Sequence, residues 1–423
     1  MLTHLAGPYV VGIDAGGTKT RCVVLTLGGA LAGSGTGPGA NPNSGGDTAG
    51  ALTTALREAL GDLDRTHILT GVFGIAGAGS AGRPAAVAAA RQAWQAVGLR
   101  GSPAVVTDIA VAFAAGTSEP KGIVVFSGTG AGAAVISDGA IVQRADGYGW
   151  LVGDEGSAVW LGKEAVRAAL AAYDGRGSPT LLTDSVPRAL LGATVVAEID
   201  AERRRPRRPR ALAMAGAPPA PPPGVSVLPQ AASLASGGAP HRGGGTGTAV
   251  LVPDDPRPPS VPYPPSGDGA GPPGHTGPCG SLGPPGHPAA PGPPGHPELP
   301  GTPPNPRLAQ AIIKEVYGRP PAALGRLGPV VAAAAAAGDP VARRITEEAA
   351  QWLLRDVDAV RPALSDPRAP VVMHGSVLRE GPVADAVRTG LRDRFAEAPR
   401  CAGDGAVGAA GMALRRLGHP LPG

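Results

Sequence analysis

The sequence predicts an α/β protein of two lobes built on one plan, with a long Pro- and Gly-rich segment inserted in the second lobe. Short apolar runs typical of buried strands alternate with helical stretches over residues 9–190 and again over 308–417. One glycine turn joins two strands near residue 16, and another joins two strands near residue 128. Most of the 49 prolines lie within residues 201–306, so the composition averages two kinds of polypeptide.

The first lobe shows a regular succession of strands and helices. The run that starts at Tyr9 and the β-branched run that starts at Arg21 are typical of buried strands. Asp47 precedes a helical stretch and can cap it, because its carboxylate can accept a hydrogen bond from the free amides of the first turn. The predicted strands are 9–13, 21–27, one after Gly28-Gly29, 67–75 and 104–107, and the predicted helices are 48–60, 83–97 and 109–115.

The second lobe repeats the strand–turn–strand start with different residues. Asp138-Gly139 between two apolar runs is a strong hairpin signal. The predicted strands are 122–126, 131–136, 140–144 and 369–373, and the predicted helices are 157–172, 322–337, 341–360, 381–395 and 406–417.

Residues 191–306 form the predicted insert. This segment holds one aromatic residue, Tyr263, and no apolar stretch long enough to offset the entropy of ordering, so disorder is expected. Glycine recurs at every third residue over 271–286, but Ala289 and Glu298 break this collagen-like register. A low-complexity repeat is therefore favoured over a triple helix, and over metal binding by the three His residues of the repeat.

Charge, cysteines and apolar runs exclude several classes of protein. The arginines of residues 202–210 account for more than the net charge of +4, and no aromatics interleave them, so we expect no nucleic-acid partner. Cys22, Cys279 and Cys401 supply neither a disulfide framework nor paired metal spacing. No apolar run approaches the ~20 residues that span a bilayer, and no secretory signal is visible. We expect a soluble cytoplasmic protein without a membrane partner.

The first glycine turn, residues 14–20, has the composition of a phosphate-binding loop. Backbone amides of Gly16 and Gly17 can converge on phosphate oxygens because no Cβ blocks the approach. Thr18 and Thr20 add hydroxyl donors, Lys19 adds positive charge, and Asp14 can hold Mg²⁺ through water. The plain alternative is a hairpin turn, in which Asp and Gly are common.

The second glycine turn repeats this device at Gly128, Thr129 and Gly130. Two such turns facing each other across a cleft would hold both ends of a triphosphate. The pair is therefore stronger support for nucleotide binding than either turn alone.

With these motifs the chain resembles the N-acetylglucosamine kinases of the actin/hexokinase/Hsp70 ATPase superfamily. They stand in the branch that also holds the activators of benzoyl-CoA reductase and 2-hydroxyacyl-CoA dehydratases. The resemblance rests on the two glycine turns, Thr107-Asp108, the run Gly147–Ser157, the turn at 373–377 and the start of the closing helix at 405–410, and it covers residues 9–190 and 308–417. It implies a two-lobed actin-like, ribonuclease H-like ATPase fold. The implied domains are 1–118 with a closing helix 404–423, then 119–190 and 307–403.

The resemblance also implies a role for each site residue. Asp108 would accept the proton of the sugar 6-hydroxyl during phosphoryl transfer from ATP, with helix capping as the plain alternative. Asn41, Gly147, Tyr148 and Asp154 would bind the sugar, although Asn43 is close enough to Asn41 to compete for that role, and Glu155 could cap the next helix. Gly375 and Ser376 would lie on the adenosine side, and Trp160 and Trp352 are expected in the core.

Three functional hypotheses stay open. The first is an ATP- and Mg²⁺-dependent kinase of a small amino sugar, most simply N-acetylglucosamine, with a homodimer possible. The second is an ATP-driven activator of a CoA-ester reductase or dehydratase, which needs cysteines for a [4Fe–4S] cluster that Cys22, Cys279 and Cys401 do not supply. The third is a core inactivated by the insert, whose composition is what a wrong reading frame through GC-rich DNA would give.

Overall fold

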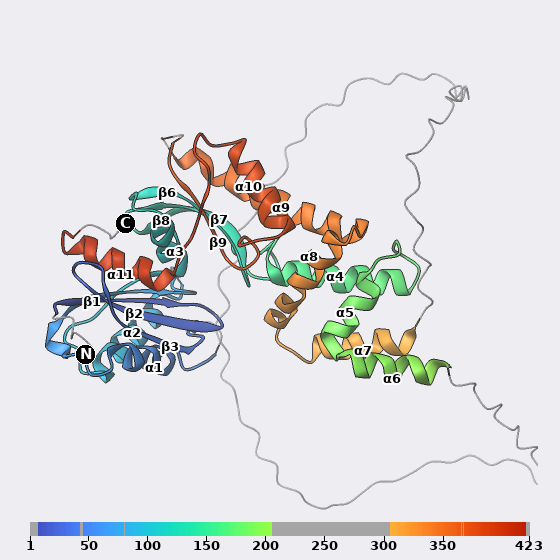
Figure 1. The fold of residues 1–423 in the computed structure, drawn as a ribbon, viewed down its shortest axis with the longest axis horizontal. Coiled ribbons are helices and arrows are strands. Elements are labelled where there is room, and N and C mark those ends of the chain that lie inside the picture. The colour runs from blue at the N-terminus through green and yellow to red at the C-terminus, as the bar shows by residue number, and fades with distance from the viewer. Residues whose placement is uncertain are drawn as a thin grey trace, which may run out of the picture. The chain divides into compact units, whose positions relative to one another are not determined.

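The computed structural model describes residues 7–42, 45–79, 81–204, 305–364, 366 and 368–419. These residues lie in one of the chain's two compact units, residues 1–206 with 297–423 (Figure 1). The bulk of the predicted insert, 205–304, lies outside the described residues, as do the arginines of its cluster beyond Arg204, its collagen-like repeat and Cys279.

The first sheet has the strand order β3-β2-β1-β4-β5. β1 pairs antiparallel with β2, which pairs antiparallel with β3, while β4 and β5 run parallel to β1. The helices α1 (Thr48–Leu60) and α2 (Arg83–Ala96) cover one face, and Asp47 caps α1 as expected by accepting from Gly50 N at 2.8 Å. The strands are β1 Tyr9–Ala15, β2 Lys19–Thr26, β3 Leu31–Pro38, β4 Ile68–Ile75 and β5 Ala104–Thr107, with a short 3₁₀ turn, η2, at Arg65–His67.

The second sheet repeats this plan in the order β10-β9-β6-β7-β8. β6 pairs antiparallel with β7, which pairs antiparallel with β8. β9 and β10 are added in parallel beside β6, as β4 and β5 are beside β1 in the first sheet. The prediction of two lobes on one plan is confirmed. The strands are β6 Lys121–Ser127, β7 Ala131–Ser137, β8 Ala140–Asp146, β9 Val371–His374 and β10 Arg400–Cys401.

Two helices, α3 (Asp108–Gly116) and α11 (Gly405–Arg416), join the sheets through a shared core. Successive side chains of a strand point to opposite faces, so Val10 of β1 enters this core while Val11 packs towards α1. Val124 of β6 enters the same core from the second sheet. Figure 1 shows α11 along β1, on the side of the sheet opposite to α1 and α2.

Gly12 of β1 allows the close approach of α11. A Cβ at this position would lie 2.1 Å from the Ala406 carbonyl oxygen and 2.3 Å from the Ala410 amide nitrogen. Any larger residue would therefore push the last helix away from the first strand.

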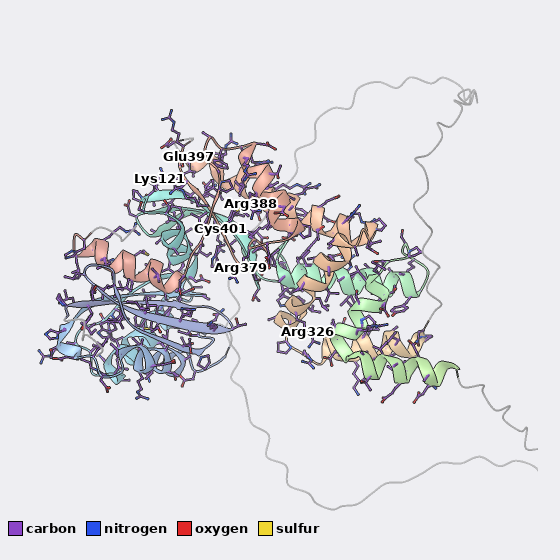
Figure 2. The ribbon with its side chains drawn as sticks, viewed as in Figure 1. Lys121, Arg326, Arg379, Arg388, Glu397 and Cys401 are labelled. Carbon is purple, nitrogen blue, oxygen red and sulfur yellow. The ribbon has the colours of Figure 1, made fainter. Side chains whose placement is uncertain are left out.

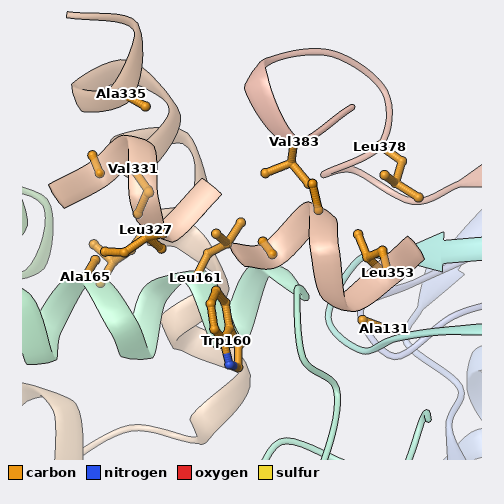
Figure 3. Close-up of a cluster of buried hydrophobic side chains, with 14 of the residues drawn as sticks. Ala131, Trp160, Leu161, Ala165, Leu327, Val331, Ala335, Leu353, Leu378 and Val383 are labelled. Carbon is orange, nitrogen blue, oxygen red and sulfur yellow. The ribbon is translucent and has the colours of Figure 1, made fainter. Parts of the chain in front are cut away.

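The outer face of the second sheet is covered by helices that form the largest core cluster. Figure 3 shows side chains of α4, α8 and α9 interlocking there, with Trp160 among them, so Trp160 belongs to the core as predicted, while Trp352 is partly buried and packs against this cluster. The helices of this lobe are α4 Ala158–Tyr173, α5 Leu182–Leu191, α7 Pro306–Tyr317, α8 Gly328–Ala336, α9 Pro340–Val360 and α10 Pro382–Arg392, with 3₁₀ turns η3 Pro321–Leu327 and η4 Arg361–Ala363.

One predicted helix, 322–337, is in fact two elements. A 3₁₀ turn occupies 321–327, and α8 begins anew at Gly328-Pro329. Proline has no amide hydrogen to donate and its ring clashes with the preceding turn, so Pro329 fits the first turn of a new helix better than the interior of a longer one.

The start of the predicted insert at residue 191 is wrong, because a helix, α6 (Ala193–Arg204), follows α5 directly. Val196 on α6 is buried in the second-lobe core, so a few apolar residues suffice when a neighbouring helix is there to cover them. Asn305, just before α7, donates to Asp200 Oδ1 at 2.8 Å, and Arg307 pairs with Glu202 at 2.7 Å. The ends of the chain on either side of 205–304 thus lie next to each other.

Within the described part of the chain, no helix combines the length and apolarity needed to cross a bilayer.

Candidate functional site

The first glycine turn connects β1 to β2 in an open conformation. Gly16 N donates to Lys19 O at 2.9 Å, and a Cβ at Gly17 would meet nothing within 4 Å. Thr18 and Lys19 are exposed. Thr20 departs from the expectation, because its side chain is fully buried and its hydroxyl donates to Pro38 O at 2.6 Å. That proton is already used, as is the Gly16 amide proton, so Gly17 and Thr18 are the open positions of this turn.

Asp14, at the end of β1, lies in a crowded acidic environment. Burial, followed by the charges of the nearby Asp108 and Asp404 carboxyls, raises the pKa of its carboxyl to about 7, against the guanidinium of Arg21. Like charges at short range disfavour ionisation of all partners. A cation placed among these carboxyls would relieve the repulsion.

Asp404 is the residue of this group that the sequence did not single out. It caps α11 by accepting from Ala406 N at 2.9 Å and pairs with Arg21 at 2.8 Å. A Cβ at Gly405 would lie 2.3 Å from Asp14 Oδ2, so this glycine lets the start of α11 approach the Asp14 carboxylate. An Asp-Gly pair directly before the predicted last helix was the available signal, and it indicates a cap without revealing the neighbour.

Asp108 is the first residue of α3, directly after β5. The alternative that it caps the helix is wrong, because Thr107 is the cap and accepts from Ala110 N at 3.3 Å. Asp108 Oδ1 accepts from Ile109 N at 3.0 Å, which leaves Oδ2 for another partner. Burial raises the pKa of this carboxyl to about 6, against hydrogen bonds from backbone amides that lower it.

The segment that carries Asn41 is fastened to the first glycine turn. Ala40 N donates to Gly16 O at 3.0 Å, and a Cβ at Gly39 would lie 2.2 Å from Gly17 O. Asn41 follows directly and is half-buried. Asn43, its competitor, lies outside the described residues.

The second glycine turn holds three segments together through Ser127. Ser127 is fully buried, and its hydroxyl donates to Gly156 O at 2.8 Å. The backbone carbonyl of Ser127 accepts from Val377 N at 3.1 Å. Gly375, with φ of 103°, packs so closely that a Cβ would lie 2.1 Å from that carbonyl. Ser127 thereby joins the second glycine turn to residues 153–157 and to the Gly375-Ser376 turn. The sequence did not reveal this role of Ser127.

Asp154 lies beside this turn. Its Oδ1 accepts from Ala131 N at 3.3 Å, and a Cβ on Gly130 would lie 3.1 Å from the same oxygen. Burial is the main cause that raises the pKa of its carboxyl. Ser157 caps α4 by accepting from Trp160 N at 3.0 Å, so the alternative of a Glu155 cap is wrong.

Tyr148 stands on an exposed loop tip and is 66% exposed. It follows Gly147, whose φ is 76°, and Arg144 lies over its ring at 5.8 Å from the centroid. Trp150, Leu151 and Val152 of the same tip are also exposed.

His374, the last residue of β9, and Arg379, which follows the strand, flank the Gly375-Ser376 turn. Burial and then the Arg379 guanidinium lower the pKa of His374, which favours its neutral form. Figure 2 labels Arg379, which follows β9, and Cys401 of β10. Cys401 is exposed, whereas Cys22 is buried in the other sheet, where burial raises the pKa of its thiol far above the usual range.

The predicted site residues therefore form two groups, one on each sheet. In the described ranges, no set of three or more His, Cys, Asp or Glu side chains is arranged to hold a metal ion by itself. The first group comprises Asp14, Gly16, Gly17, Thr18, Lys19, Asn41 and Asp108, and the second comprises Gly128, Thr129, Gly130, Gly147, Tyr148, Asp154, Gly375 and Ser376.

Comparison with known proteins adds two findings on sequence. A family model described as the BadF/BadG/BcrA/BcrD ATPase family matches residues 11–413. An N-acetylmuramic acid/N-acetylglucosamine kinase of Clostridium acetobutylicum is 32% identical over 180 residues, which make up 42% of this chain and 58% of that relative. The match thus spans little more than half of the relative's length.

Two solved structures, both of proteins provisionally named N-acetylglucosamine kinases, share the fold. The protein from Chromobacterium violaceum superposes with a TM-score of 0.53 and 20% identity over 96% of this chain and 98% of its own. The one from Porphyromonas gingivalis gives 0.54 and 15% over 96% and 99%. At these identities the likeness concerns the fold alone, and the two-lobed actin-like class predicted from the sequence is confirmed.

Proposed function

This chain belongs to the BadF/BadG/BcrA/BcrD ATPase family, and we propose that it transfers the γ-phosphoryl group of ATP to the 6-hydroxyl of an amino sugar. N-acetylglucosamine is the first acceptor to test. The observation that carries this proposal is Asp108, a desolvated carboxyl that starts a helix without being needed as its cap. The activity of the Clostridium acetobutylicum relative points to the same substrate class.

Asp108 acts as the base. The acceptor oxygen forms a bond to the γ-phosphorus while the bond from that phosphorus to the ADP oxygen breaks, and the hydroxyl proton passes to the Asp108 carboxylate. A pKa of about 6 suits this task, because the group is ionised at neutral pH yet more basic than an ordinary aspartate.

The two glycine turns supply the phosphate contacts. Gly17 from the first lobe and Thr129 and Gly130 from the second offer backbone amides, which stabilise phosphate charge without reorganising during the reaction, whereas the Gly16 and Gly128 amides donate within their own turns. The Gly375-Ser376 turn, joined to the second glycine turn through Ser127, contacts the adenosine side.

The acidic group around Asp14 fits Mg²⁺, since carboxylate and water oxygens are its preferred ligands. A magnesium ion brought by ATP takes most of its ligands from phosphates and water, so one or two protein carboxylates suffice. Asp14 would hold it, and the ion would offset the negative charge of the phosphates during transfer. Asn41 and Asp154 bind sugar hydroxyls in this proposal: the Asn41 amide can donate and accept hydrogen bonds, and the Asp154 carboxylate can accept them.

A panel of amino sugars offered with ATP in a coupled ADP-release assay tests the proposal. We expect turnover of N-acetylglucosamine or a close relative, a 6-phosphate product by ³¹P NMR, and loss of both in Asp108→Asn. ATP hydrolysis that no sugar stimulates would refute the kinase assignment. Cys22 is buried, which speaks against a cluster shared between subunits, and iron analysis of anaerobically prepared protein checks that alternative.

A further inference from the structure

Asp146, the last residue of β8, fastens both ends of the loop that carries Asp154. Its Oδ1 accepts from Asp154 N at 2.9 Å and from Tyr148 N at a longer 3.4 Å, and its Oδ2 accepts from Glu155 N at 3.0 Å. The side chain is buried, and hydrogen bonds to a carboxylate are roughly twice as strong as those between neutral groups. One side chain therefore holds the backbone of a loop whose middle is otherwise exposed.

The loop backbone is shaped for this contact. Asp146, Gly147, Gly149 and Asp154 all have φ between 56° and 98°, a region that glycine, aspartate and asparagine tolerate best. Gly153 is required for another reason, because a Cβ there would lie 2.3 Å from Asp146 Oδ1.

The strand register places Asp146 beside the second glycine turn. Asp146 pairs with Gly132 of β7, one residue after Ala131, whose amide donates to Asp154. Asp154 is thus held at its amide by Asp146 and at its carboxylate by Ala131.

Other charged groups face Asp146 from the elements around it. The carboxyls of Asp154 and Glu155 lie on the loop itself and that of Asp356 comes from α9, while Arg144, on the same strand as Asp146, acts on Asp154. Asp356 Oδ2 is buried without a hydrogen-bond partner. Among these acidic neighbours, three loop amides donate hydrogen bonds to the Asp146 carboxylate.

We propose that Asp146 is a positioning residue for the acceptor side: by accepting the loop amides it sets the backbone of residues 147–155 and, through it, the Asp154 carboxylate. The proposal rests on the proposed function for its effect on the sugar, but the fastening of the loop is independent of that function. Neither the resemblance nor the two glycine turns point to this residue.

Asp146→Asn is the sharpest variant. Asparagine tolerates the left-handed backbone and keeps one acceptor oxygen, but it loses the charge and the second acceptor. Gly153→Ala disturbs the same contact between Asp146 and the loop amides, because its methyl group would clash with Asp146 Oδ1, but it leaves the Asp146 side chain in place. Asp138→Asn is the matched control, because Asp138 also has a positive φ, 51°, but lies at the β7–β8 hairpin without contact to the loop.

Hydrogen exchange of the peptide covering 147–157 gives a readout that needs no substrate. We expect exchange about 10- to 100-fold faster in Asp146→Asn and in Gly153→Ala, with unchanged exchange in α4 and in the control. The double variant should exchange no faster than the more affected single one, because both changes remove one contact. Parental exchange rates in both single variants would overturn the fastening.

Steady-state kinetics test the consequence. The KM for the amino sugar should rise about 10-fold in Asp146→Asn, with the KM for ATP within about twofold and kcat less affected than the sugar KM. Faster exchange with an unchanged sugar KM would overturn the positioning role. If the parental protein phosphorylates no amino sugar, the proposed function fails, and the exchange comparison still decides whether Asp146 fastens the loop.

Discussion

The two sheets share a strand plan but carry different chemistry at equivalent positions. Counted back from the last pair before each glycine turn, Asp14 and Arg21 in the first sheet correspond to Phe126 and Gly132 in the second. The first pair carries two charges, whereas in the second the Phe126 ring fills the space over a glycine. The same hairpin thus serves a charged site in one lobe and a packed one in the other.

The helices that follow the last strand of each sheet extend the comparison. α3 follows β5 and starts with Asp108, and α11 follows β10 and is capped by Asp404. Both carboxyls raise the pKa of Asp14. Asp404, which follows the last strand of the second sheet, therefore lies close to Asp14 and Asp108 of the first lobe. We propose accordingly that the first lobe holds the reacting charges, while both lobes supply backbone amides and contacts to the acceptor.

The largest effect should come from Asp108→Asn. We expect kcat to fall about 10²- to 10⁴-fold, the usual contribution of a positioned base, with the KM of both substrates nearly unchanged. Asp404→Asn, from the equivalent helix start, keeps a good cap and should lower kcat far less. Equal losses in the two variants would show that the acidic group acts only through its total charge.

Acceptor recognition should draw on both lobes. Asn41→Ala in the first and Asp154→Ala in the second should each raise the sugar KM about 10- to 100-fold, because a buried polar partner of a hydroxyl is lost. The KM for ATP, measured in the same assay, should change little. Parallel increases in both KM values would mean that these residues maintain the shape of the site.

The pH profile should report the desolvated base. Asp108 must be ionised to accept a proton, and its pKa is raised to about 6, so kcat/KM should fall about tenfold per pH unit below that value. Asp14 titrates nearby, so the observed midpoint belongs to the pair. A profile flat down to pH 4.5 would contradict this prediction.

Carboxyl crowding in the second lobe should affect stability rather than rate. Burial, followed by the charges of Asp146 and Glu155, raises the pKa of Asp356 to about 7. The folded state is therefore most stable at a pH below the ordinary aspartate pKa near 3.9. This stability is lost as the pH rises through about 7. Asp356→Asn should therefore stabilise the protein at pH 8 by about 1 kcal/mol, a figure reduced for partial solvent exposure, and hardly at pH 4.5.

Thermal melts at pH 4.5 and 8 measure this difference, with Asp358→Asn as the control. Asp358 lies on the same helix but pairs with Arg394 at 2.8 Å, so its removal should lower the Tm at pH 8. The same sign for both variants would contradict the crowding argument.

The smallest effect is expected from replacing residues 205–304 with a short Gly/Ser linker. The Asn305–Asp200 and Arg307–Glu202 contacts already bring α6 and α7 together, so a short connection can close the gap. The Tm and the kcat should stay within error of the parental values or improve. Loss of folding or of ATP binding would show that the segment belongs to the fold.

Strand and helix positions could be predicted wherever local pattern and tertiary burial agree. β5 lies at the predicted 104–107, and α1 begins after Asp47 as its cap chemistry indicates. The sequence did not predict α6 because the helix has few apolar residues, and these stabilise it only when they are buried against α5 and α7. β10, two residues long, has no pattern of its own and exists because β9 offers it an edge.

The site divides in the same way. Glycine turns and carboxyls at strand ends are visible in the sequence, because residue type and local position identify them. The uses of the Thr20 hydroxyl, the Ser127 hydroxyl and the Asp404 carboxylate depend on segments far away in the chain, so spacing alone could not reveal them.

Gly12 fixes the order in which the first lobe can be completed during synthesis. The strand at residues 9–15 emerges early from the ribosome, but the helix that fits against Gly12 is nearly the last segment to be made. Until then one face of the first sheet exposes Val10 and its neighbours to water. At ~5–20 residues per second, translating residues 205–304 lengthens this exposure by roughly 5–20 s. The nascent chain therefore spends that extra time as a candidate for chaperone binding.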